Sequence, residues 1–329
     1  MKFKNVIGID VSKNTIDVFD HLAKQHNQFT NSNKGIRDFL KWVVSLNNLL
    51  IETLFVYEHT GMYSHTITEY LSSKNLHYFV APALDIKRSM GITRGKDDVV
   101  DAKRIALYGF RLRDEITPTK THSSHITKLK SLMSLKTKLI KQRASFKVTL
   151  NEQKNIYKAK DFQAIYTVQE KMIHYLSKQI KAIENEIYSI IEKQEDLKQS
   201  LGLILSIKGI GMQMATTMII ATENFSKFEN WRKFASYCGI APFPYQSGSS
   251  IRGRNRVSQL ANKKIKSLIH MCAISSIQHN AEMKKYYESR VEKGKSKMST
   301  INIIRNKLIA RIFAVINRQT PYVDTMKFA

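Results

Sequence analysis

Four acidic residues occupy positions from which they could act together on a metal ion: Asp10, Glu58, Asp98 and Asp101. Asp10 lies inside the apolar strand pattern of residues 5–12, where Asp is disfavoured and its charge cannot be buried without a partner. Glu58 ends the β-rich run TLFVYE, while Asp98 and Asp101, three residues apart in a helical pattern, share one helix face. Carboxylates gathered in this way repel one another unless a divalent cation neutralises them.

The chemistry that such a cluster supports is phosphoryl transfer. Oxygen ligands suit Mg²⁺ or Mn²⁺, and two such ions about 4 Å apart can stabilise the attacking and leaving oxygens of phosphodiester cleavage. Taken singly, each carboxylate has an ordinary alternative role as a turn cap, a solvated strand end or the partner of a neighbouring basic residue. Asp17, in the next strand pattern, has no place in the set, and we expect it to be solvated.

A second candidate site combines hydroxyls with cations in GIAPFPYQSGSSIRGRNRVS, residues 239–258. Its members are Ser247, Ser249 and Ser250, followed by Arg252, Arg254 and Arg256. A serine that attacks phosphorus needs cations to stabilise the charged transition state. Because no base for a serine is visible, the residues alone favour a basic loop whose serines form turns and bond phosphates.

Basic residues elsewhere point to nucleic acid. The segment LSIKGIGMQMATTMI, residues 205–219, resembles a helix-hairpin-helix, in which Gly209 and Gly211 would let the backbone and Lys208 approach a phosphate. A plain helix turn is the alternative. Lys263 and Lys264, in KKIKSLIH, would add phosphate contacts that do not depend on base sequence.

The charge balance defines the class of partner. The chain has 329 residues and a formal net charge of +26, which predicts a polyanion partner, either nucleic acid or an anionic membrane surface. No apolar run approaches the roughly 20 residues of a membrane span, so nucleic acid is favoured and no membrane association is expected. The apolar fraction of 43% indicates a real core, and Cys238 and Cys272 are expected to be buried free thiols in a reducing cytoplasm.

The elements that must position these residues divide the chain into three predicted parts: an α/β domain at 1–118, a helical connector at 119–200 and a mostly helical C-terminal domain at 201–329. In the first part, strand patterns alternate with helical ones, which predicts a mixed sheet covered by helices. The strands are expected at 5–12, 15–20, 53–58 and 77–81, and the helices at 33–46, 63–73 and around KDDVVDAKRIA. In the third part, residues 241–257 are expected to form a loop.

The connector is predicted to be a coiled coil. Residues 122–200 contain no Gly or Pro, and apolar residues from Ile173 to Leu197 follow a heptad seam that only Gln194 breaks. A weaker seam before a break near residues 159–161 predicts two long helices folded back as a hairpin. A spacer that packs on itself and a dimerisation arm both remain open.

Taken together, the motifs resemble a known family. GIDVSK, YEHTGMY and KDDVVDA are similar to the D, E and D-x-x-D-A signatures of the DEDD transposases, insertion-sequence recombinases that include the Piv-type DNA invertases. IKGIG…FENWRKFASYCGIAPFPYQSG resembles that family's C-terminal transposase domain. The resemblance implies a RuvC-like, RNase H-type fold for the first domain. It also implies a metal-binding tetrad of Asp10, Glu58, Asp98 and Asp101, with Asp98 selected over Asp97 by the D-x-x-D-A spacing.

The same resemblance implies a mechanism and partners. Ser247, beside Gly248, would be a nucleophile that forms a covalent phosphoserine intermediate in a dimer or tetramer. A structured RNA encoded by the element would guide the enzyme to donor and target DNA, in the cytoplasm of a bacterium and at the nucleoid when DNA is bound. The stretch from Val257 to Ala261 lacks the Lys and Gly of the family's Ser-Lys-x-Gly pattern, which leaves open which basic residues assist Ser247.

The favoured expectation is therefore a Mg²⁺-dependent transposase or site-specific DNA recombinase. Its main alternative is a structure-selective RuvC-like nuclease in which water attacks and Ser247 only binds phosphate. A non-enzymatic nucleic-acid-binding protein and an actin-like ATPase are further alternatives. The ATPase is disfavoured because no further glycine-rich phosphate loop occurs before residue 200.

Overall fold

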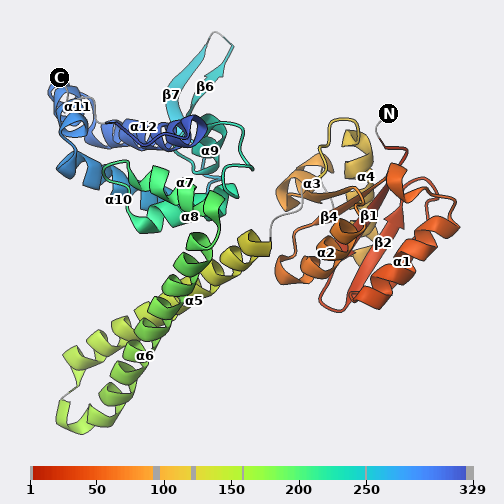
Figure 1. Ribbon diagram of the computed structural model, residues 1–329, viewed down its shortest axis with the longest axis horizontal. Helices are drawn as coiled ribbons and strands as arrows, with labels where there is room; N and C mark the ends of the chain where they lie inside the picture. The colour runs from red at the N-terminus through yellow and green to blue at the C-terminus, as the bar shows by residue number, and fades with distance from the viewer. Residues whose placement is uncertain (1–2, 92–96, 120–123, 158, 249, 324–329) are drawn as a thin grey trace. The chain divides into compact units, whose positions relative to one another are not determined.

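The protein folds as two compact units, Met1–Thr121 and His122–Ala329 (Figure 1). The computed structural model describes residues 3–91, 97–119, 124–157, 159–248 and 250–323. The helical hairpin and the C-terminal helices share one hydrophobic core and form a single compact unit. The domain boundary near residue 200 therefore stays a prediction.

The first unit is built on a five-stranded mixed sheet with the strand order β3-β2-β1-β4-β5. Neighbouring strands are antiparallel from β1 to β3 and parallel from β1 through β4 to β5. The strands are β1 Asn5–Val11, β2 Thr15–Asp20, β3 His26–Thr30, β4 Thr53–Glu58 and β5 Tyr78–Ala81. The sequence prediction missed β3 because HNQFT contains a single apolar residue and so has no apolar alternation.

Helices cover both faces of this sheet. Alternate residues of β1 and β4, such as Ile9 and Tyr57, pack against α1 Asn33–Ser45 and α2 His65–Ser73. The intervening residues, such as Val6 and Val56, pack against α3 Ala83–Ser89 and α4 Asp98–Leu112. Short 3-10 helices lie at Leu50–Glu52 and Gly61–Ser64. The fold of this unit is thus the mixed α/β sheet that the sequence predicted.

The second unit begins with a hairpin of two long helices, α5 Ser124–Ile156 and α6 Ala159–Glu192 (Figure 1). The ion pairs Lys128–Glu186 at 2.7 Å and Lys154–Glu170 at 2.6 Å join opposite ends of the two helices, so the helices are antiparallel. The sequence predicted the break near residues 159–161; in the structure α5 ends at Ile156 and α6 begins at Ala159. The predicted seam is interrupted at Gln194 because α6 has ended there and Gln194 is the N-cap of the next helix.

Six further helices follow the hairpin among the described residues of this unit. They are α7 Glu195–Leu205, α8 Met212–Thr222, α9 Trp231–Tyr237, α10 Lys263–His279, α11 Ala281–Glu292 and α12 Lys297–Arg318. Their core is continuous with the base of the hairpin, since Leu129 of α5 and Ile191 of α6 belong to the same buried cluster as Ile309 of α12. Within the described ranges, no helix is both long enough and apolar enough to span a membrane.

The segment expected as a loop is a β-ribbon, and that expectation was wrong. β6 Pro242–Ser247 pairs antiparallel with β7 Ile251–Val257, and the ribbon projects from the helices of its unit (Figure 1). Pro242 and Pro244 suggested a loop, yet a two-stranded ribbon leaves outward-facing backbone positions where no N–H is needed. Gly248 takes the positive φ of +56° in the turn. Ser249 lies outside the described residues.

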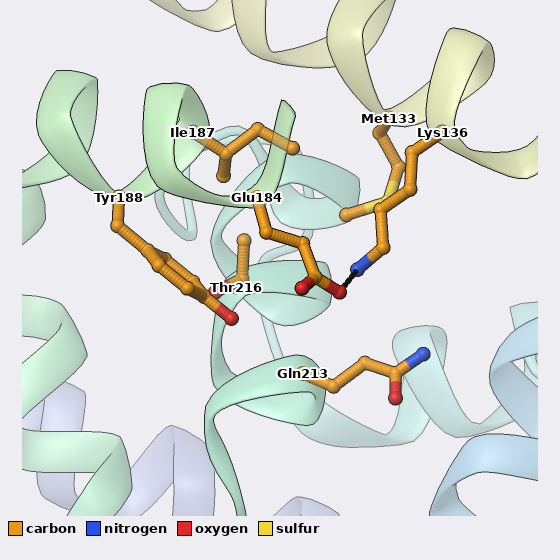
Figure 2. A pocket seen from close by; sticks show the side chains of 7 residues that line it. All are labelled: Met133, Lys136, Glu184, Ile187, Tyr188, Gln213 and Thr216. Atoms are coloured by element: carbon orange, nitrogen blue, oxygen red, sulfur yellow. Dashed lines mark ion pairs between the residues drawn. The ribbon is translucent and has the colours of Figure 1, made fainter. Parts of the chain in front are cut away.

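A buried ion pair joins the two helices of the hairpin beside a small cavity that α8 also lines (Figure 2). Lys136 of α5 lies 2.9 Å from Glu184 of α6, and the two side chains are only 8% and 26% exposed. They border a cavity of about 10 Å³, which is room for one water molecule. The buried hydroxyl of Thr216, on α8, lines this cavity and has no hydrogen-bond partner among the described residues. The cavity therefore has a polar lining, but one of its buried polar groups lacks a hydrogen bond.

This pair gives a stability prediction. Glu184→Ala should destabilise the second unit by about 3 kcal/mol, because Lys136 would keep a buried charge without its partner. The exposed pair Lys128–Glu186 is the matched control, and Glu186→Ala should leave the urea midpoint unchanged. The double variant Lys136→Met/Glu184→Leu should recover most of the loss, since neither charge is then buried. Equal midpoints for Glu184→Ala and Glu186→Ala would contradict this reading.

Candidate active site

Strand alternation brings Asp10 and Glu58 to the same face of the sheet. In β1, Ile7 and Ile9 enter the core beneath α1 and α2, so Asp10 faces the side covered by α4. The parallel register pairs Ile9 with Tyr57, which places Asp10 and Glu58 one residue further along adjacent strands. Since neighbouring strands are about 4.8 Å apart, the two carboxylates project side by side from the ends of β1 and β4.

The other two carboxylates lie in the first turn of α4. Asp97 is the N-cap of this helix, and its side chain accepts a hydrogen bond of 3.0 Å from the backbone N–H of Val99. Asp98 is the first helical residue and is exposed, whereas Asp101, one turn later, accepts a hydrogen bond of 2.8 Å from Arg104. Asp97 therefore serves the helix, and Asp98 and Asp101 are displayed from its first turn.

A glycine–alanine contact seats α4 against β1. A Cβ atom on Gly8 would lie 2.2 Å from the backbone nitrogen of Ala106 and 2.3 Å from the carbonyl oxygen of Ala102. Both alanines are fully buried. Gly8 belongs to GIDVSK and Ala102 follows Asp101 in KDDVVDA, so the two motifs meet here. Sequence reasoning missed this role, although a glycine inside a strand is itself a sign of close backbone approach.

This contact predicts that Gly8→Ala is severe. The added methyl group meets backbone rather than a flexible side chain, so α4 must shift away from β1. Overpacking of this kind costs about 1–3 kcal/mol, and it would also displace Asp98 and Asp101 from Asp10. Thermal unfolding and DNA cleavage should both suffer. Gly202→Ala, in α7 and with open space around it, should be neutral or stabilising. Wild-type stability in Gly8→Ala would refute the packing role.

The electrostatics of Asp10 reflect this grouping. The pKa of Asp10 is raised to about 6, first by burial and then by the charges of Asp98, Asp101, Asp17 and Glu58. The three other sequence-predicted carboxylates therefore all lie close enough to Asp10 to raise its pKa. They are not assembled as a ligand shell, because no three His, Cys, Asp or Glu side chains among the described residues are close enough together to hold a metal ion.

Asp17 is a further carboxylate of this face, and the expectation that it is solvated was wrong. Its residue is 3% exposed and lies directly opposite Asp10 in the antiparallel register. His26 lies 3.0 Å from its carboxylate and Gln28 donates to it at 3.1 Å. Both partners come from β3, the strand that the sequence prediction missed. The charge of Asp17 is thus satisfied from β3 while it adds repulsion at Asp10.

Ser247 lies at the tip of the β-ribbon. It is the last residue of β6, is exposed, and is paired with Ile251. Arg252 is paired with Gln246, so by alternation it projects from the opposite face of the ribbon to Ser247. Arg256 is paired with Phe243 near the root, beyond a bulge. The arginines are therefore close along the chain, but they are not gathered around the serine hydroxyl.

The predicted hairpin at residues 206–211 connects α7 and α8. A Cβ atom on Gly209, whose φ is +91°, would lie 2.0 Å from the hydroxyl oxygen of Ser276 in α10. That hydroxyl donates a hydrogen bond of 3.2 Å to the carbonyl of Lys208, and the backbone of Gly211 hydrogen-bonds the thiol of Cys272. Gly209 thus has a packing role against α10, whereas a Cβ atom on Gly211 would meet nothing within 4 Å. A phosphate-binding role for this turn stays a prediction, as it does for the exposed Lys263 and Lys264.

Two family models and several known proteins match this chain. Residues 7–154 match a family model described as Transposase, that of DEDD transposases of the IS110 type, and residues 201–288 match the Transposase IS116/IS110/IS902 family. Pilin gene-inverting proteins of Moraxella bovis and Moraxella lacunata are each 28% identical over 329 residues, covering 97% of this chain and 98% of theirs. An uncharacterized 43.6 kDa protein of insertion element IS110 from Streptomyces coelicolor is 23% identical over 148 residues, 45% of this chain and 35% of that protein.

These matches define the class of protein as a DNA transposase or recombinase, with the acidic α/β unit and the ribbon-bearing helical unit each falling in a matched region. The chain belongs to the IS116/IS110/IS902 family of transposases.

Proposed function

We propose that the protein is a Mg²⁺- or Mn²⁺-dependent recombinase that cuts and rejoins DNA through Ser247, guided by a structured RNA encoded by its element. The observation that carries the proposal is that Asp10 and Glu58 lie at the ends of adjacent strands, on the sheet face covered by α4, and that the first turn of α4 carries Asp98 and Asp101, in a strongly basic chain. We also infer that the first unit is RNase H-like, of the RuvC type. Three antiparallel strands followed by two parallel ones, in the order β3-β2-β1-β4-β5, support this.

The donor set fits a divalent cation. All four side chains offer oxygen, and a cation would relieve the repulsion that, together with the larger effect of burial, raises the pKa of Asp10. Asp10, Glu58, Asp98 and Asp101 would hold it, and Asp101 would have to leave Arg104 to do so. When bound, Mg²⁺ supplies Lewis-acid stabilisation of charge on phosphodiester oxygens.

The serine step conserves bonds. The Ser247 Oγ attacks phosphorus and loses its proton, a phosphoserine ester forms, and the bridging oxygen of the broken strand leaves as a hydroxyl. Attack of a second DNA hydroxyl on the phosphoserine restores the serine and joins the new strand. Because one ester replaces another at each stage, cutting and rejoining need no external energy source.

The proposed partners are donor DNA, target DNA, the guide RNA and further copies of the chain as a dimer or tetramer. The net charge of +26 supports a large polyanion load. Oligomer formation is supported by an exposed apolar stripe on α6 with heptad-like spacing, distinct from the seam that packs against α5. The stripe comprises Ile165, Val168, Met172 and Tyr175, which are 44%, 61%, 38% and 56% exposed.

Sequencing of the nucleic acid that co-purifies with the protein tests the proposal that an RNA guides the recombinase. A single defined RNA from the flanks of its own gene is the expected result. Random host nucleic acid, removed by high salt without loss of recombination, would contradict guidance while leaving the cut-and-rejoin chemistry standing.

A second candidate function is a structure-selective nuclease in which water attacks phosphorus. The observation that favours it is the ribbon register, which turns Arg252 away from the face of Ser247 and leaves the serine without that cation beside it. Under this alternative the serine only contacts phosphate, so its removal would weaken cleavage slightly rather than abolish it.

A further inference from the structure

The ribbon that carries Ser247 has two chemically different faces. Phe243, Tyr245 and Ile251 are 46%, 64% and 46% exposed. Alternation along β6 places Phe243 and Tyr245 on the same face as Ser247, and Ile251 is the direct partner of Ser247 on β7. Gln246 and Arg252 form a pair on the opposite face. An exposed aromatic row beside the candidate nucleophile is not explained by packing, because every residue of β6 is exposed.

Tyr245 is the most exposed of these side chains, and its ring is held in one position by the partner strand. It is paired with Gly253, and a Cβ atom at that position would lie 2.7 Å from Cδ1 of the tyrosine ring. The ring therefore lies over the space that the glycine leaves open. Any larger residue at position 253 would push the ring away from the ribbon. The contact holds the aromatic ring against the partner strand while most of its surface stays exposed.

The charge of the ribbon selects the occupant of this face. Residues 241–257 contain three arginines and no acidic residue, so two such ribbons would repel one another and a second copy of the chain is a poor partner. Nucleic acid offers anionic phosphates for the arginines and flat bases for the tyrosine. Stacking of a base on an aromatic side chain contributes about 1–3 kcal/mol and tolerates any base.

We propose that Tyr245 stacks on an unpaired DNA base that flanks the phosphate at Ser247, and that Arg252 contacts the phosphate backbone from the opposite face. Alternate residues of a strand are about 6.8 Å apart, so the ring and the hydroxyl can engage neighbouring parts of one strand. The position of the phosphate rests on the proposed function, whereas the stacking contact does not. Tyr245 is thus a substrate-positioning residue.

A double-mutant cycle between protein and DNA tests the contact. Ser247→Ala protein, which prevents turnover, is titrated with a labelled single-stranded thymidine oligonucleotide and with the same strand carrying abasic linkers. The base-bearing strand should bind more tightly. Tyr245→Ala should reduce that preference roughly tenfold, and Tyr245→Trp should keep it. Tyr157→Ala, which removes a tyrosine 44% exposed at the end of the helical hairpin, is the matched control and should change nothing.

Each other outcome has a defined meaning. Arg252→Ala should weaken both strands equally and flatten the salt dependence, as expected for a phosphate contact. An equal loss on both strands for Tyr245→Ala, or no loss on either, would overturn the stacking contact. A loss confined to an RNA strand of the same sequence would overturn the assignment to DNA. If the cycle holds but an otherwise wild-type Ser247→Ala protein still recombines DNA, the proposed function fails and the stacking contact stands.

Discussion

Replacing Ser247 by alanine should abolish DNA strand exchange, with a loss of about 10³-fold or more, because removal of a covalent nucleophile leaves no equivalent route. The fold should be unaffected. Ser247 is exposed at the ribbon tip, and its pairing with Ile251 is made through the backbone. The measurement is formation of joined DNA products by protein carrying its co-purified nucleic acid, in the presence of Mg²⁺.

Ser250→Ala is the matched control for this prediction, since it removes an exposed hydroxyl from the same end of the ribbon. It should retain joining within a few-fold of wild type. Cleavage without joining in the Ser247→Ala protein, at a rate close to wild type, would instead identify a nuclease that uses water.

Replacing Asp10 by asparagine should have two opposite effects. Catalysis should fall by about 10³-fold or more, because the replacement removes a charged oxygen ligand at the centre of the group. Stability without metal should rise at neutral pH. The pKa of folded Asp10 is about 6, above its ordinary value of 3.8, so its ionisation opposes folding.

The pH dependence of this effect has a definite sign. Below about pH 4 the carboxyl group is protonated in both states, and Asp10→Asn should match wild type in thermal stability. The wild-type protein should lose stability relative to the variant as pH rises from 3.8 through about 6, and the difference should then stay constant. Partial exposure of Asp10 to solvent will reduce the size of this stability difference. Scanning calorimetry in a chelator measures it.

Divalent cations should reverse the order of thermal stability between wild type and Asp10→Asn. Mg²⁺ or Mn²⁺ should raise the melting temperature of wild-type protein by a few degrees, and should do so much less in Asp10→Asn. Asp114→Asn, which replaces an exposed aspartate of the same unit, should behave as wild type in every assay. If Asp10→Asn keeps full activity and neither cation shifts the wild-type melting temperature, the carboxylates are structural.

The sequence alone predicted those helices and strands in which buried apolar residues repeat at a regular spacing. The strands β1, β2, β4 and β5 and the two long helices were all predicted, because their apolar residues repeat with period two or about 3.5. β3 left no such trace. The ribbon was not predicted because its two strands are exposed, so their sequence shows no alternation of buried and exposed residues. Proline and glycine in the same stretch favoured a loop.

The candidate site was predictable only in part. The grouping of Asp10 with Glu58 follows from two strands that end together, and the pairing of Asp98 with Asp101 follows from helix spacing. The burial of Asp17 depended on the β1–β2 register and on partners from β3. The seating of α4 on Gly8 depended on how closely helix and sheet approach, which no local pattern encodes.

The central claim, that Ser247 becomes covalently joined to DNA in a reaction that needs the acidic group, can be tested by mapping the adduct. Protein is incubated with DNA and Mg²⁺, denatured and digested, and peptides that carry nucleotide are sequenced by mass spectrometry. We expect a phosphodiester on Ser247 that is absent in chelator and absent in Asp10→Asn. Cleaved or joined DNA without any adduct, or an adduct on another residue, would contradict it.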